Sequence, residues 1–149
     1  MDRAGYALLA LTGGGLIAAQ APINARLRTV LHAPVGSALI SFVVGTLVLA
    51  VAALVAGQMG DTVSRLGGGP WWAYLGGICG AVFVFATLLA SPRIGVTETF
   101  VAVVLGQVVV AALIDRFGWF GVKAIPLTWQ RGLAIGLLVV SLVLIEGES

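Results

Sequence analysis

Five long apolar runs fill most of this sequence and restrict its fold more than any other feature. They cover about residues 4–24, 35–57, 71–91, 95–114 and 127–145. Each run is close to the roughly 20 residues that a helix needs to cross a bilayer. In lipid the backbone polar groups must be satisfied within the segment, and a helix does this alone. We therefore predict an all-α membrane protein with five transmembrane helices and a single domain over residues 1–149.

The composition excludes the usual soluble classes. The 149 residues are 60% hydrophobic and 9% charged, with a mean hydropathy of +1.11, whereas soluble domains contain about 25% charged residues. The basic residues are scattered through short segments, which is typical of topology signals and not of a nucleic-acid surface. The chain has one cysteine, Cys79, and one histidine, His32. We expect no metal site and no cofactor, and we interpret His32 as a solvated loop residue.

The first run has two interpretations. A basic residue before it and its end at Ala19-Gln20-Ala21 resemble a signal peptide with a small-residue cleavage site. We interpret it instead as a transmembrane helix that bends or ends near Pro22, because the proline ring removes a backbone hydrogen bond. The connections that follow are predicted to be a basic loop over 26–34, a polar loop over 58–70 and a tight turn over 91–93.

An odd number of spans places the two termini on opposite sides of the membrane. Positive charge is divided five to three between the two faces, which is a weak instruction for orientation. The face of the N-terminus has Arg3, Arg65, Arg116, Lys123 and Arg131, and the opposite face has Arg26, Arg28 and Arg93. Aromatic anchors also gather toward the N-terminal face, at Tyr6, Trp71, Trp72, Tyr74, Trp119 and Trp129. Two copies inserted in opposite orientations would give each leaflet one aromatic belt and cancel the charge bias.

A few polar side chains interrupt the apolar runs, and most of them lie toward the face opposite the N-terminus. They are Gln20, Asn24, Ser41 and Glu98, with Gln107 at greater depth. Gln20 and Asn24 are four residues apart and therefore share a helix face. Each residue taken alone has a structural explanation, since amides bond between helices and serine bonds to its own backbone. Because they converge on one side, we expect them to line a cavity that binds substrate.

Glu98 has two competing interpretations. It is either an acid in the first helical turn after a Thr97 cap, where it neutralises the helix dipole and pairs with Arg93, or a site for a proton or cation, as intramembrane carboxylates often are. Gln107 lies nine residues further on, or roughly 13 Å along the helix.

Two glycine pairs have the small-xxx-small spacing that permits close helix packing, within the chain or in a dimer. They are Gly76 with Gly80 and Gly132 with Gly136. The ordinary use of glycine in membrane helices explains the same pairs equally well.

Several motifs, in order along almost the whole chain, resemble the five-span YdcZ-like (EamA-type) family of the drug/metabolite transporter superfamily. They are Gln20-Ala-Pro-Ile-Asn24-Ala-Arg-Leu27, Ser41-Phe-Val-Val-Gly45, Trp71-Trp-Ala-Tyr-Leu-Gly76-Gly77, Pro92-Arg-Ile-Gly95, Gly106-Gln107 and Asp115-Arg-Phe-Gly118. The resemblance implies a multi-pass protein of the bacterial inner membrane that works as an antiparallel dimer, of one chain or of two paralogous chains. The family pattern has small or apolar residues where Glu98 stands, so a role of Glu98 in coupling would be specific to this chain.

Alternating access requires inverted repeats around a central site, and this chain has no internal duplication. We therefore expect half of a ten-helix inverted-repeat transporter, completed by a second copy. The leading function is a secondary transporter of a small polar or cationic metabolite or drug, with export coupled to protons or ions.

A passive channel formed by an inverted dimer and an accessory membrane subunit remain alternatives. An enzyme is not expected, because His32 lies in a loop and Cys79 lacks an obvious base. The acids Asp61, Asp115, Glu146 and Glu148 fall in loops or at the terminus.

Overall fold

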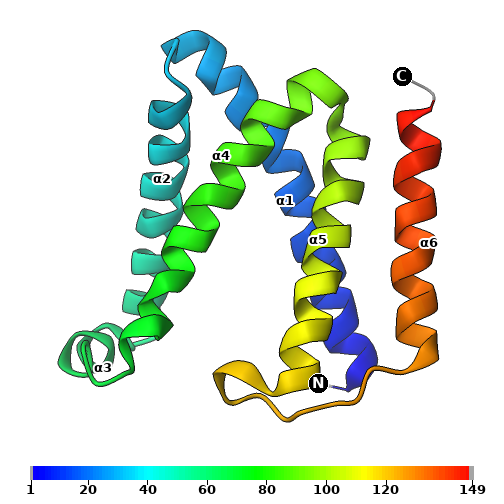
Figure 1. Cartoon of the computed structure of the whole chain (residues 1–149). Coiled ribbons are helices and arrows are strands. Elements are labelled where there is room, and N and C mark those ends of the chain that lie inside the picture. The colour runs from blue at the N-terminus through cyan, green and yellow to red at the C-terminus, as the bar shows by residue number, and fades with distance from the viewer. Residues whose placement is uncertain (1, 148–149) are drawn as a thin grey trace. The chain divides into compact units, whose positions relative to one another are not determined.

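The computed structural model describes residues 2–147, and the secondary structure that it assigns to them is helical. Five helices are long and apolar enough to cross a bilayer (Figure 1): α1 (Arg3–Leu31), α2 (Pro34–Val55), α4 (Gly76–Ile94) with the 3-10 helix η1 (Trp71–Leu75) before it, α5 (Val96–Phe117) and α6 (Trp129–Glu146). Short helices α3 (Met59–Ser64) and η2 (Trp119–Gly121) lie in the connections. The predicted all-α protein with five membrane-spanning helices is thus confirmed. Glu148 lies outside the described residues.

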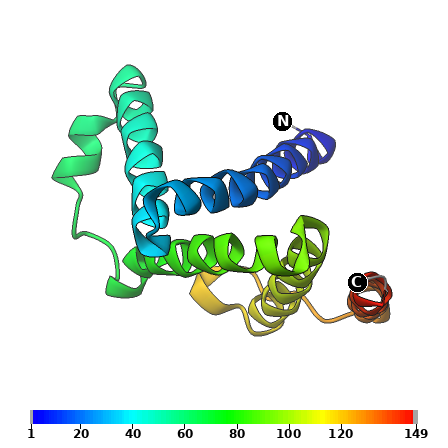
Figure 2. The same cartoon turned by 90° about the horizontal axis from the view of Figure 1, so that it is seen from above.

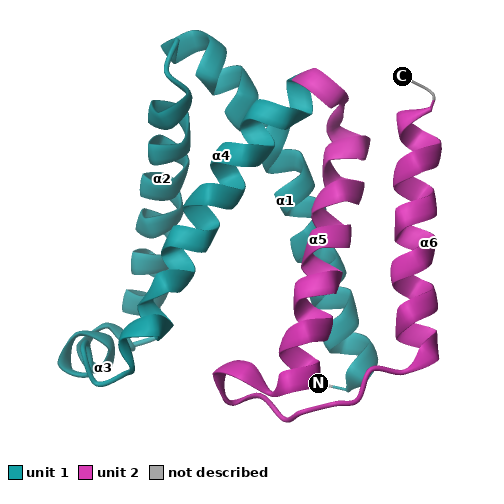
Figure 3. Cartoon of the chain, viewed as in Figure 1, with its two compact units in different colours: residues 1–92 teal, residues 93–149 magenta. Residues whose placement is uncertain are grey.

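The chain forms two compact units, coloured separately in Figure 3. The first covers residues 1–92 and contains α1, α2, α3 and nearly all of α4. The second covers residues 93–149 and contains α5 and α6.

The first helix is longer than the sequence predicts. Instead of ending near Pro22, α1 continues to Leu31, so Arg26 and Arg28 belong to the helix and not to a loop. The proline costs only one hydrogen bond, to the Ala18 carbonyl, and membrane helices tolerate this loss. The 29 residues of α1 measure about 44 Å, against a hydrocarbon core of about 30 Å, so the helix is longer than a bilayer crossing requires.

Helices α1 and α2 are joined by a short turn and diverge from it (Figures 1 and 2). His32 adopts the left-handed conformation that ends α1, and it is exposed. Pro34 then begins α2, at a position where its missing N–H is not needed. The polar connection over 58–70 contains α3 and is closed by Tyr74, whose hydroxyl accepts hydrogen bonds from the Gly67 and Gly69 N–H groups at 3.0 and 3.3 Å.

The predicted turn over residues 91–93 is also wrong in position. α4 continues through Pro92 to Ile94, and Gly95 alone separates it from α5. Gly95 makes so short a connection possible because it has φ 83° and ψ 158°, a region that side chains with a Cβ rarely enter.

The buried core of the first unit is small. Ala38, Val84 and Leu88 form it, with Phe83 and Leu89 packed against it. Most of each spanning helix is exposed within the single chain, as expected when lipid covers the apolar surface. In the first unit α1 packs against α2, and this small cluster adds side-chain contacts between α2 and α4.

In the second unit, α5 and α6 pack against each other. Asp115 near the end of α5 forms an ion pair with Arg131 in the first turn of α6, with 2.8 Å between Oδ2 and Nη1. The Ile125 N–H donates to the Asp115 carbonyl at 2.7 Å and so fixes the intervening loop against the helix end.

Candidate functional site

One serine hydroxyl joins the polar residues of the first two helices. Ser41 Oγ accepts a hydrogen bond from Gln20 Nε2 at 2.9 Å and a second from Asn24 Nδ2 at 3.2 Å. Gln20 and Asn24 present their amides from the same face of α1, and Ser41 faces them from α2. The structure therefore brings together three of the five polar residues that the sequence selects.

Ser37 adds a second contact between α2 and Asn24. It lies one turn before Ser41 on α2, is fully buried, and donates from its hydroxyl to the Asn24 carbonyl at 2.6 Å. Asn24 is itself only 5% exposed. Because both its backbone and its side chain are bound to α2, Asn24 is held in a fixed orientation.

Two members of the cluster, Gln20 and Ser41, line a pocket of about 290 Å³ between α1, α2 and α4. Its polar side chains are Gln20, Ser41 and Thr46. The remaining lining residues are Ile17, Phe42, Gly45, Leu49, Gly80, Phe83 and Val84. Within residues 2–147, the Gln20 amide oxygen accepts no hydrogen bond and the Ser41 hydroxyl donates none. The Gln20 oxygen is therefore available to a hydrogen-bond donor of a ligand, and the Ser41 O–H to an acceptor.

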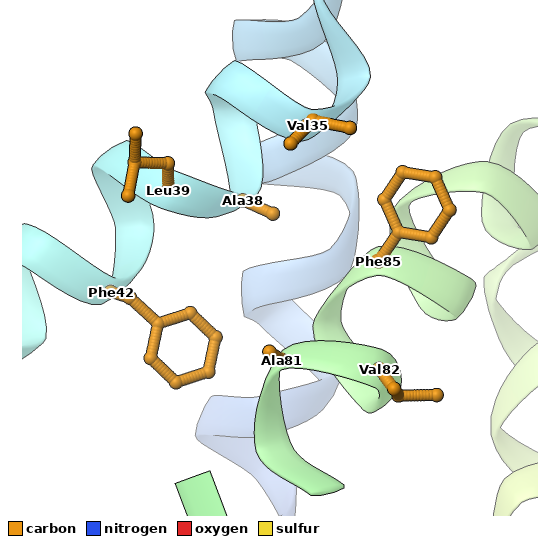
Figure 4. Close-up of a pocket in the computed structure, with 7 residues that line it drawn as sticks. All are labelled: Val35, Ala38, Leu39, Phe42, Ala81, Val82 and Phe85. Carbon is orange, nitrogen blue, oxygen red and sulfur yellow. The ribbon is translucent and has the colours of Figure 1, made fainter. Parts of the chain in front are cut away.

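A second pocket, of about 440 Å³, lies between α2 and α4 and has an entirely apolar lining (Figure 4). The rings of Phe42 and Phe85 stand on either side of the small side chains Ala38 and Ala81. Val35, Leu39 and Val82 complete the lining. These residues have no distinguishing signal in the sequence, because apolar side chains on a membrane helix look alike whether they face lipid or a cavity.

The other two predicted polar residues lie on α5, in the second unit. Glu98 is half-buried in the first helical turn, and Gln107 is exposed. They are nine residues apart on one helix and do not meet. The predicted Thr97 cap is wrong, because the N-cap is Gly95, whose carbonyl accepts from the Thr99 N–H and hydroxyl at 3.2 and 2.6 Å.

The four glycines selected for helix packing differ in their surroundings. At Gly80, a Cβ would stand 3.3 Å from the tip of the Phe42 ring, so this glycine makes room for an aromatic side chain of α2. At Gly76, Gly132 and Gly136, nothing in the described part of the chain lies within 4 Å of such a Cβ. Packing of these three against a second chain stays a prediction.

Arg28 has a partner that its place in the sequence did not indicate. Its Nη1 lies 3.5 Å from the Leu88 carbonyl, to which it donates. In a regular helix this carbonyl would accept from residue 92, but Pro92 has no N–H. Arg28 therefore occupies the carbonyl that the proline leaves free, and it connects the ends of α1 and α4.

Five membrane-competent helices define a polytopic membrane protein, and the first three of them enclose a pocket with polar side chains. The model of the family described as "Putative inner membrane exporter, YdcZ" matches residues 5–144. The chain belongs to this YdcZ family. The match confirms the resemblance seen in the sequence and makes this a multi-pass protein of the inner membrane. No curated protein and no solved structure matches the chain.

Proposed function

We propose that the chain is a secondary transporter that exports a small polar or cationic metabolite or drug by alternating access, as an antiparallel dimer. The observation that supports this most directly is the cluster of Gln20, Asn24 and Ser41, two members of which line a pocket in a member of a family of inner membrane exporters. Polar groups at membrane depth are costly, and they usually serve a cavity or a transport path.

The depth of the cluster supports the proposal of a dimer. Ser41 is seven residues from the first residue of α2 and 14 from the last, or about 10 Å and 21 Å. Such a site lies nearer one membrane face, whereas a carrier must open the same site to each side in turn. A second copy in the opposite orientation supplies the inverted half, and a paralogous five-span chain could take its place.

Transport in proteoliposomes under an imposed pH gradient tests the proposal, with the fluorescent cation ethidium and the neutral solute N-butylurea as probes. We expect slow, saturable flux of at least one probe, and about a tenfold loss of transport efficiency in Ser41→Ala, since that variant leaves two amides without their acceptor. Ser141→Ala on α6 is the matched control. Flux that does not saturate would indicate a channel, and the absence of flux for both probes would favour an accessory subunit.

We assign the coupling of transport to protons or ions to Glu98. Glu98 is an acid in the first turn of a membrane helix. Such a carboxylate can bind and release a proton or cation as the transporter opens to one side of the membrane and then to the other. In Glu98→Gln we expect transport to lose its response to the pH gradient while cross-linked dimer is still recovered. Glu146→Gln, at the other end of the chain, should retain the response. A Glu98→Gln variant with unchanged coupling would leave Glu98 with the structural role of an acid at a helix N-terminus.

A further inference from the structure

The two pockets of the first unit share one wall. Phe42 lines both the polar pocket beside Gln20 and Ser41 and the apolar pocket between α2 and α4. Ser41 and Phe42 are consecutive on α2, so their side chains point about 100° apart. Ser41 faces α1, and the Phe42 ring reaches α4.

The position of the Phe42 ring depends on Gly80. Its tip lies 3.3 Å from the place where a Cβ of residue 80 would stand, so a side chain there would require the ring to shift. The ring is the boundary between two spaces of different chemistry. One offers an amide oxygen and a hydroxyl among apolar side chains, and the other offers only alkyl and aromatic surface.

We infer that these pockets are two compartments of one site that takes an amphipathic molecule, with a hydrogen-bonding head at Gln20 and Ser41 and an apolar tail passing Phe42 into the second compartment. This inference rests on the proposed function and narrows its substrate class. Neither compartment is lined by a charged side chain, so the head is recognised here through hydrogen bonds. The two compartments are separated only by the Phe42 side chain. One molecule can therefore occupy both, with its head in the first and its apolar tail in the second.

A homologous series of N-alkylureas, from methyl to hexyl, tests the two compartments separately. Every member has the same head, and only the tail grows. We expect binding to the protein in nanodiscs, corrected for empty nanodiscs, to tighten about three- to fourfold per methylene until the apolar compartment is full, the factor that corresponds to about 0.8 kcal/mol per buried CH₂. Ser41→Ala should weaken all members by the same factor.

Filling the apolar compartment provides the decisive variant. Ala81→Phe places a ring where the tail would lie, so we expect methylurea binding to be unchanged and the gain with tail length to disappear. Ala86→Phe makes the same substitution on the same helix, at a residue that lines neither compartment, and should leave the gain intact. If Ala81→Phe loses its helical circular dichroism, the smaller Ala81→Leu replaces it, with a partial loss of the gain expected.

The outcomes separate this inference from the proposed function. Binding that depends on Ser41 but not on tail length overturns the two-compartment site and leaves the transporter proposal intact. A gain with tail length that Ala81→Phe removes, without saturable transport of any member, supports the site and overturns the transporter proposal. Phospholipid that co-purifies with the wild type and is lost in Ala81→Phe, seen by native mass spectrometry, would identify the apolar compartment as a lipid site and overturn the inference.

Discussion

At Ser41, one hydroxyl oxygen accepts from two amides of the neighbouring helix. A serine oxygen has two lone pairs, so both are occupied and only its O–H remains for a ligand. A ligand acceptor that binds there would use the O–H of this hydroxyl. A movement of α1 relative to α2 during alternating access would break the hydrogen bonds to its oxygen. The proposed substrate site and the contact between the two helices thus share the same few atoms.

Arg28 and Pro92 are predicted to be coupled, because the arginine donates to the Leu88 carbonyl that the proline leaves without its helical donor. Arg28→Ala should lower the free energy of unfolding by about 0.5–1 kcal/mol in the natural sequence. In a Pro92→Ala background the residue 92 N–H returns to Leu88, and the same substitution should cost much less. Thermal unfolding followed by circular dichroism in detergent would measure this double-mutant cycle.

The control for that cycle is Arg26→Ala, which removes an exposed arginine from the same helix end. Equal costs of Arg28→Ala in both backgrounds would show that the contact with Leu88 does not contribute to stability.

At the scale of elements, the connection between α4 and α5 depends on one residue. Gly95 has φ 83° and ψ 158°, so Gly95→Ala should destabilise the protein by about 1–3 kcal/mol. Gly106→Ala is the matched control, since Gly106 lies inside α5 with space around it and should be neutral or up to about 1 kcal/mol more stable. Equal unfolding temperatures for the two variants would contradict the strained turn.

The pair Asp115 and Arg131 clamps α5 to α6 even though each charge is at the unfavourable end of its helix. An acid near a helix C-terminus and a base near an N-terminus both oppose the helix dipole. Either single reversal, Asp115→Arg or Arg131→Asp, replaces the ion pair by two like charges, and we expect a net destabilisation of about 0.5–1 kcal/mol despite the gain at one helix end. The double reversal restores the pair with both dipoles satisfied and should unfold at or above the wild-type temperature, as measured by circular dichroism.

The outcome that contradicts this interpretation is a double reversal as unstable as the single ones. Lys123→Glu is a useful control, because it reverses a charge in the same connection at an exposed residue that takes no part in the pair.

At the scale of the whole molecule, the basic residues are divided almost evenly between the two membrane faces. We therefore expect this five-span chain to insert in both orientations. Paired reporters fused to the C-terminus, one active only in the cytoplasm and one only outside, should therefore both give signal. Signal from one side alone would remove the antiparallel homodimer and require a separate partner of opposite orientation.

Orientation can also be forced, which supplies the control for that experiment. Added lysines in the connection over 58–70 should hold the N-terminus inside, and added lysines around His32 should hold it outside. Each locked variant alone should be inactive in transport, and the two expressed together should recover activity. Full activity of one locked variant would contradict the antiparallel arrangement.

Much of this protein follows from the sequence alone, because the bilayer imposes such strong constraints. Length and hydropathy are enough to predict five helices, since lipid leaves the backbone no alternative, and ordered motifs are enough to predict the family. Helix ends were predicted less well. Pro22 and Pro92 both signal an interruption, yet both helices continue, because one missing hydrogen bond costs less than ending a helix in an apolar environment.

Only the tertiary structure decided which side chains share a site. The sequence singles out Gln20, Asn24 and Ser41 as polar. That both amides donate to the Ser41 hydroxyl depends on how α1 and α2 pack together. It offers no signal for Phe42, for the apolar compartment or for the contact of Arg28 with Leu88. A hydropathy pattern indicates whether a residue tolerates lipid. In this chain most residues of the spans do, so only the packing of the helices determines whether a given side chain faces lipid, a neighbouring helix or a cavity.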